Sequence, residues 1–396
     1  MRLRPFDRRL PTTQSSLLSR NVLVSIAVVT AVGLSACADE EAAPRRKTSK
    51  NGTERFRTGD TSTAVVCTRD PSFYDVPGDN CDNDDDGQID NAPTCDADAT
   101  GNTASEFAHA IGICDHANGR GFGLVSAAFT QGYGRSDAPR DEQHGLLPKF
   151  GNVLRPREGS KLGVLSTGYA KEFNGPGGTS SFNPGISWGN MGRPGAAPPG
   201  YPKPTADCPQ AEAVNDVVDL KLTLTAPKNV SGFRFDFNFH SSEWPAYICT
   251  SFNDGFVAWL SATGFNGGQA DNISFDANKN PVSVNNGFFD RCTPNVVTGC
   301  QGQSQGVSTC AAGPAELAGT GFGLEGTGCP NEWATRGGAT GWLTSRAAVT
   351  PGETFTLELM IYDVGDGSLD SSVLIDNFQW IGGNITTSTE RPNDVK

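Results

Sequence analysis

Residues 233–240 read Phe-Arg-Phe-Asp-Phe-Asn-Phe-His, an alternation of four aromatic and four polar side chains. Successive side chains of a β-strand point to opposite faces, so the four phenylalanines share one face of a strand. Burial of each ring contributes about 1.5–3 kcal/mol, which is enough to make that face part of a core. The segment therefore predicts a half-buried strand, with its polar residues on the other face.

The same period of two recurs in residues 220–224 and 355–361, whereas residues 256–260 and 373–380 are more continuously apolar, as central strands are. Helical spacing is evident in residues 104–115, where Phe107, Ile111 and Cys114 recur along one face. Turns are plentiful, because the chain contains 48 Gly and 25 Pro. We predict an all-β, jelly-roll-like sandwich of two antiparallel sheets with one short N-terminal helix.

The N-terminus has the organisation of an export signal. Arginines precede the apolar run 22–36, which is too short to span a bilayer as a finished helix. The run ends in Leu34-Ser35-Ala36-Cys37, which resembles the bacterial lipobox, whose Cys carries diacylglycerol. We expect a lipoprotein signal peptide over residues 1–36, a lipid anchor on Cys37 and delivery to the outer membrane or cell surface. The alternative is an ordinary signal peptide that happens to precede a Cys.

A polar segment follows the expected cleavage site. Residues 37–63 contain only one large apolar side chain, Phe56, and cannot bury enough surface to offset the entropy of ordering. We expect a flexible tether there and a polar tail over residues 383–396. The net charge of −13 excludes a nucleic-acid partner, because such proteins need clustered Lys and Arg.

Ten of the 11 cysteines remain if Cys37 is lipidated, an even number that favours disulfide bonds in an exported chain. None forms a Cys-x-x-Cys pair, so zinc and thioredoxin-like sites lack their basic spacing. Residues 188–210 and 291–341 are longer than ordinary connections and are predicted to be loop insertions, the second of them stapled by disulfides. The sequence leaves the pairing open.

Residues 64–100 form an Asp- and Cys-rich segment whose centre reads Asp-Asn-Asp-Asp-Asp-Gly-Gln-Ile-Asp over residues 82–90. This order matches the front of an EF-hand-type calcium loop, with a Gly for the sharp turn, but Pro93 replaces the final Glu. The pattern resembles the loops of thrombospondin type-3 repeats and Asp-rich motifs of secreted myxobacterial proteins. A solvated acidic linker is the alternative. Hard oxygen ligands favour calcium over zinc, and the candidate ligands are Asp82, Asp84, Asp86, Gln88 and Asp90.

A second set of acidic residues lies at the ends of the expected strands. These residues can meet at one end of the sandwich and bind a second calcium ion, or they can cap turns, as Asp often does. The sequence does not separate the two readings. The residues are Glu243, Asp254, Asp363, Asp366 and Asp370.

The sequence around this second set resembles a known family. Residues 237–256 read FNFHSSEWPAYICTSFNDGF and residues 361–378 read IYDVGDGSLDSSVLIDNF. Their order and spacing are similar to the choice-of-anchor L domain, which is found in exported bacterial proteins. The segments GVLSTG (163–168) and SVNN (283–286) also fit, and the resemblance extends over about residues 121–380. Ser242 departs from the family, which usually has an acidic residue there, and the insertion 291–341 is unusual.

The resemblance implies a surface- or matrix-associated β-sandwich over residues 101–382 without an established activity. We therefore expect an adhesive or ligand-binding module with a glycan or protein ligand. Aromatic side chains at Trp188, Tyr201, Trp244 and Trp333 can stack on sugars or pack into the fold. The alternative is a carbohydrate hydrolase that uses Glu243 with Asp254 or Asp363. His240 is expected to be a solvated residue at a strand end rather than a catalytic base.

Overall fold

The structure, a computed structural model, describes residues 67–91, 93–96, 99–171, 193–205, 208–285, 287–302, 305–323 and 337–392. The expected signal peptide, Cys37 and the tether lie outside the described residues. Trp188, Trp333 and Cys329 lie outside them as well.

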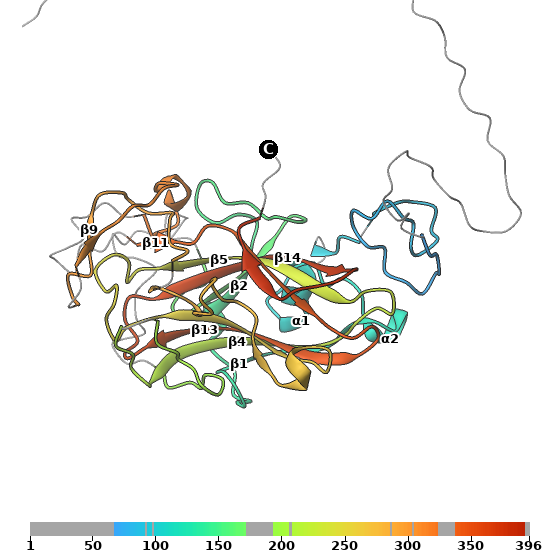
Figure 1. Cartoon of the computed structure of the whole chain (residues 1–396), viewed down its shortest axis with the longest axis horizontal. Helices are drawn as coiled ribbons and strands as arrows, with labels where there is room; N and C mark the ends of the chain where they lie inside the picture. The colour runs from blue at the N-terminus through green and yellow to red at the C-terminus, as the bar shows by residue number, and fades with distance from the viewer. Residues whose placement is uncertain are drawn as a thin grey trace, which may run out of the picture. The chain divides into compact units, whose positions relative to one another are not determined.

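Two antiparallel sheets face each other (Figure 1). The first, named here the β13 sheet, has the strand order β1-β4-β13-β6-β7, and β8 also pairs with β6. Its strands are β1 (Gly123–Thr130), β4 (Val214–Thr225), β13 (Thr354–Val364), β6 (Gly255–Ser261), β7 (Asp271–Asn272) and β8 (Val282–Ser283).

The second sheet, named here the β5 sheet, has the order β15-β12-β5-β14-β3-β2, and β11 also pairs with β5. A separate short hairpin joins β9 (Val297–Thr298) to β10 (Gly306–Val307). The strands of the β5 sheet are β15 (Ser388–Glu390), β12 (Leu343–Ala348), β5 (Gly232–Ser241), β14 (Ser371–Ile381), β3 (Leu162–Ser166), β2 (His144–Leu147) and β11 (Gly338–Ala339).

The main core lies between the two sheets and confirms the predicted sandwich. All four phenylalanines of β5 are fully buried, and Phe237 packs against Phe256 of the opposite sheet with ring centroids 4.8 Å apart. Leucines at every second position of β4 and β13 complete the core from the other side. The alternation seen in the sequence therefore places these residues on one face, as predicted.

The other face of β5 is also covered, so the prediction of a half-buried strand is wrong. Asp236, Asn238 and His240 are all buried on that face. Phe150 and Phe322 lie against the His240 ring, at centroid distances of 5.3 and 5.2 Å. These covering residues come from long connections, whose contact with this strand has no local signal in the sequence.

The structure confirms the short N-terminal helix. Helix α1 spans Ala104–Ala110, and it begins with a capping box formed by Thr103 and Glu106. It ends before residue 115 because Gly112 adopts a φ of +100°, which does not continue a helix. A further single-turn helix, α2, spans Ala117–Arg120. Short 3₁₀ turns lie at Asp141–Gln143, Asn266–Gly268 and Ala315–Leu317.

The described cysteines form disulfide bonds, as the even number of cysteines predicted. The staple expected in the insertion 291–341 is present as Cys292–Cys310, and Cys300 is also disulfide-bonded. Among the described residues, no helix is long and apolar enough to cross a bilayer. The other bonds are Cys67–Cys81, Cys95–Cys114 and Cys208–Cys249.

Candidate metal centre

The Asp-rich segment forms a loop that is held by its own polar side chains. Gly87 occupies the turn position with a φ of +92°, in the left-handed region that favours glycine. Asn83 Oδ1 accepts a hydrogen bond from the Val76 amide at 2.8 Å, and Asp75 Oδ1 accepts one from the Asn83 amide at 2.9 Å. The backbone is therefore fixed before any ion is considered.

Three carboxylates of this loop converge. One oxygen each from Asp82, Asp84 and Asp86 lies within 4.8 Å of the other two, and we call this set the loop triad. Asp82 is buried and accepts hydrogen bonds from the amides of Asp86 and Gly87 at 3.1 and 3.2 Å. These residues stand at positions 1, 3 and 5 of the predicted calcium loop, and the triad can hold a metal ion.

The other two predicted ligands are placed differently. The Gln88 side chain donates to Asp86 Oδ2 at 3.4 Å, so it contacts a member of the triad. Asp90 Oδ1 instead accepts hydrogen bonds from the amides of Gly78, Asp79 and Asn80 at 2.9–3.3 Å. The structure thus uses one oxygen of Asp90 to close the loop, and its role as a ligand stays a prediction.

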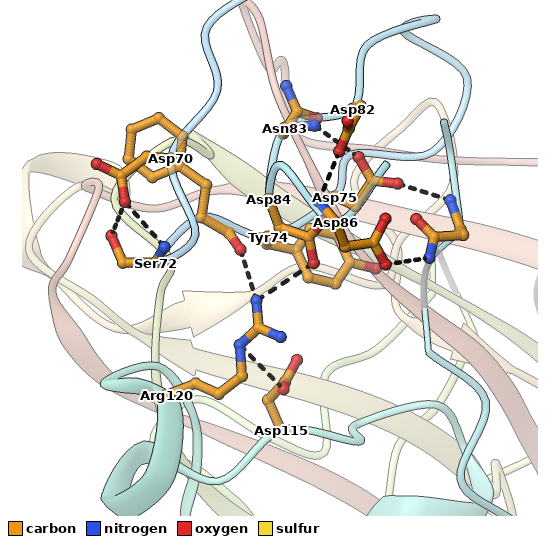
Figure 2. A network of polar contacts seen from close by, with 12 residues as sticks. Asp70, Ser72, Tyr74, Asp75, Asp82, Asn83, Asp84, Asp86, Asp115 and Arg120 are labelled. Carbon is orange, nitrogen blue, oxygen red and sulfur yellow. Dashed lines mark hydrogen bonds and ion pairs between the residues drawn. The ribbon is translucent and has the colours of Figure 1, made fainter. Parts of the chain in front are cut away.

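Two arginines offset the charge of the loop. Arg69 lies 3.3 Å from Asp82, and Arg120 lies 3.5 Å from Asp84 and 3.7 Å from Asp115 (Figure 2). Arg120 also donates to the carbonyl of Phe73 at 2.8 Å and thereby ties the loop to α2. Asp84 Oδ1, in contrast, is buried without a hydrogen-bond partner.

The sheet registers explain how the second acidic set comes together. In the β13 sheet Tyr362 pairs with Gly255, which places Asp363 beside Asp254. In the β5 sheet Ser371 pairs with Ser241, so Asp370 and the residues that follow β5 lie at the same end. We call Glu243, Asp254, Asp363 and Asp370 the strand-end cluster, and none of the four is more than 2% exposed.

Part of this cluster is hydrogen-bonded. Asp254 accepts bonds from the Ser371 hydroxyl at 2.7 Å and from the Val364 amide at 3.1 Å. Its own amide donates to Glu243 Oε2 at 3.4 Å. Asp254 thus links the two sheets through Ser371, which stands at the start of β14.

Asp370 is not hydrogen-bonded, since both of its carboxylate oxygens are buried without a partner. Asp363 lies beside the Asp254 carboxyl group and the Thr167 hydroxyl. Burial, together with the charge of Asp254, raises the pKa of Asp363 and of Glu243 well above the usual range. Burial also raises the pKa of Asp254 to about 7. The oxygens are more widely spread than in the loop triad, since the described residues contain no other acidic trio within 4.8 Å.

One residue of the second acidic set, Asp366, caps a turn, which was the alternative to calcium binding. Asp366 is exposed, and its Oδ1 accepts the Ser368 amide at 3.0 Å, as in an Asx-turn. Its charge still contributes to the raised pKa of Asp370. Asp363 and Asp370 make no such bond, so turn capping does not account for them.

The sequence analysis missed Asp216, which lies near the same end on β4. Burial raises its pKa to about 6, and its Oδ2 has no hydrogen-bond partner. Among the neighbouring charges that raise the pKa of Asp370, the charge of Asp216 has the largest effect. Asp216 has a φ of 49°, at an irregularity in the pairing of β4 with β13 that no local pattern in the sequence reveals.

The carboxylates of the alternative hydrolase are buried in this structure. Glu243, Asp254 and Asp363 are each at most 2% exposed, whereas a glycosidase pair must face its sugar. His240 is not a solvated residue either, because it is fully buried and its pKa is lowered to about 3 by burial.

A separate groove of about 500 Å³ opens on the surface beside β7. Tyr201 lines it and packs edge-on against Trp259, with ring centroids 5.9 Å apart. Trp244, another predicted sugar-stacking residue, is buried and stacks on Phe289 instead. Asn266, Asp271, Asn272, Phe275 and Lys279 also line the groove.

Comparisons with known proteins agree with the resemblance found in the sequence. The choice-of-anchor L domain family matches residues 162–379, more than half of the chain, so the chain belongs to this family. No curated protein matches. Among solved structures, TmCBM61 in complex with β-1,4-galactotriose matches with a TM-score of 0.24 and 7% identity, over 66% of this chain and 90% of that one.

Proposed function

We propose that the chain is a cell-surface lipoprotein that acts as a calcium-stabilised adhesive or ligand-binding module and not as an enzyme. The observation that carries the proposal is the loop triad of Asp82, Asp84 and Asp86, whose oxygens lie within 4.8 Å of one another. The family and the disulfide bonds fit an exported protein.

Calcium suits this loop better than other metals. The triad offers only oxygen atoms, which hard cations prefer, and no imidazole or thiolate that would favour zinc. Asp84 Oδ1 is buried without a partner, and a cation would satisfy it. Calcium also tolerates irregular geometry and accepts water as a ligand, which suits a loop whose last EF-hand position is Pro93.

Calorimetric titration of calcium into the purified protein tests this part. We expect the calcium stoichiometry to fall by one ion when Asp82 and Asp84 are both changed to Asn. Asp85→Asn is the matched control, because Asp85 lies in the same loop but outside the triad. Calcium binding that survives in the Asp82/Asp84 variant with unchanged heat and stoichiometry would refute the loop as a site.

The groove beside β7 is the proposed ligand site. Its volume falls within the range of small-molecule sites, about 300–1,000 Å³. Tyr201 offers an aromatic surface, and Asn266, Asn272 and Asp271 offer polar atoms, a combination that suits a sugar. A glycan is therefore the ligand class that we favour.

A glycan array combined with an assay for reducing sugars tests the binding function. We expect binding without turnover, and a loss of binding in Tyr201→Ala. Tyr133→Ala is the control, because Tyr133 also packs edge-on against Trp259 but lies outside the groove. Turnover that disappears in Glu243→Gln would instead restore the hydrolase.

The lipid anchor is a proposal from the sequence alone, since Cys37 lies outside the described residues. Metabolic labelling with a clickable fatty acid in a bacterial host tests it. We expect label on the wild-type protein and none on Cys37→Ala. Equal labelling of the two proteins would contradict the anchor.

A further inference from the structure

The strand-end cluster buries several acidic groups in the sandwich without a positively charged side chain to balance them. Four carboxyl groups from four separate segments lie buried at one end, and none of them forms an ion pair with a described Lys, Arg or His. Burying an ionised carboxylate without a partner is strongly unfavourable, so some positive charge or proton must be present.

Protons alone do not solve the problem. A protonated carboxyl group carries an O–H donor that needs an acceptor, and its second oxygen still needs a donor. Asp363 lies beside the Asp254 carboxyl group and the Thr167 hydroxyl, so Asp254 and Asp363 can share one proton. Both oxygens of Asp370, in contrast, are buried without any partner. Protonation would therefore remove the charges but leave the polar atoms of Asp370 unsatisfied, each with its own desolvation penalty.

A cation solves both parts at once, because one ion can accept electron pairs from several oxygens. We propose that Glu243, Asp254, Asp363 and Asp370 bind one hard divalent cation, calcium, which joins the two sheets at this end of the sandwich. Asp254 and Asp363 belong to the β13 sheet end, whereas Glu243 and Asp370 belong to the β5 sheet end. The site is separate from the loop triad and does not depend on it.

The donor set selects the class of metal. Carboxylate oxygens favour calcium, magnesium or manganese over zinc or copper. Magnesium demands a near-ideal octahedron and keeps several waters, whereas calcium takes six to eight oxygens in flexible arrangements. No three acidic residues of this cluster bring oxygens within 4.8 Å of one another, so a calcium ion would bind some of these carboxylates directly and the others through water.

Ion counting by equilibrium dialysis and elemental analysis separates the two sites. We expect the loop variant, Asp82→Asn with Asp84→Asn, to retain an ion that is absent when Asp363→Asn and Asp370→Asn are added. A loop variant without any ion would overturn the strand-end site. A loop variant that binds as many ions as the wild type would instead refute the loop triad and leave the strand-end site standing.

Thermal unfolding distinguishes an ion site from a merely structural role. In chelator, the Asp363→Asn/Asp370→Asn variant should have a Tm equal to or above that of the wild type, because repulsion between buried charges is removed. In the presence of calcium, the Tm of the Asp363→Asn/Asp370→Asn variant should be lower than that of the loop variant, because the loop variant keeps the strand-end ion. Asp219→Asn is the control, since Asp219 is equally buried but bonds to Thr130 away from the cluster, and it should keep the full calcium response.

Glu243→Gln provides a milder test that keeps the fold where the double variant does not fold. We expect its calcium affinity at the strand-end site to fall by at least about tenfold, as measured in the loop-variant background. An unchanged affinity would overturn the proposal.

Discussion

The loop triad and the strand-end cluster are both built mainly from aspartates, but they differ in how their charge is balanced. The triad lies at the surface, with Arg69 and Arg120 beside it and backbone amides bonded to Asp82. The strand-end cluster lies inside the sandwich, and both carboxylate oxygens of Asp370 have no partner. The loop can therefore keep its shape without an ion, whereas we propose that an ion stabilises the sandwich end.

The largest effect expected from this difference concerns chelation. Removing calcium should lower the free energy of unfolding chiefly through the strand-end cluster, by about 2.7–4.1 kcal/mol relative to calcium at 100–1,000 times its Kd. Calorimetry of the loop variant with and without chelator checks this. A loop variant that is indifferent to chelator would show that the loop carries the whole response.

The next effect concerns pH in the absence of calcium. Buried carboxyl groups with a raised pKa destabilise the fold where they are ionised, and this penalty disappears as they are protonated. Asp254, with a pKa of about 7, and Asp216, with a pKa of about 6, set the window. Their contribution should raise the Tm in chelator as the pH falls from 8 towards 5.

Saturating calcium should flatten this dependence, because the bound ion keeps the carboxylates ionised. Thermal scans at several pH values with calcium and with chelator make the comparison. Parallel curves in the two conditions would show that the ion does not contact these groups.

A smaller effect is expected at the loop. Asp82→Asn removes the charge and keeps one of the two oxygens, which separately accept the amides of Asp86 and Gly87. The calcium affinity of the loop should fall by roughly tenfold, or about 1.4 kcal/mol, and the Tm in chelator should fall only slightly, because one amide bond is lost. A large loss of Tm without calcium would mean that Asp82 is a structural residue first.

The smallest effect is expected for Asp90→Asn. Asp90 Oδ1 accepts the amides of Gly78, Asp79 and Asn80, and an Asn side chain can accept the same bonds. The calcium affinity of the loop should therefore change less than in Asp82→Asn. A titration that shows an equal loss would make Asp90 a ligand, as the spacing of the sequence suggested.

The sequence predicted best what depends on local pattern. The alternating phenylalanines of β5 gave the correct core face, and the spacing of residues 82–86 gave three carboxylates that do converge. The period of two cannot tell whether the second face of a strand is exposed, because the segments around Phe150 and Phe322 that cover β5 are distant in sequence. The expectation for His240 failed for this reason.

The strand-end cluster shows an intermediate case. Its residues were recognised because acids cluster after the expected strands, but their proximity depends on the registers of two sheets. Asp216 was missed because its side chain reaches this end only through a local irregularity of β4. The spacing of residues 104–115 predicted the short helix α1, but its end was not fixed by that spacing, which continues beyond Gly112.

The most direct test of the account is a crystal structure grown in calcium, with diffraction data collected at a wavelength where calcium scatters anomalously. We expect one anomalous peak among the oxygens of Glu243, Asp254, Asp363 and Asp370, and another at the loop triad. A map in which the strand-end carboxyl groups contact only one another and water, with no peak between them, would contradict the central claim.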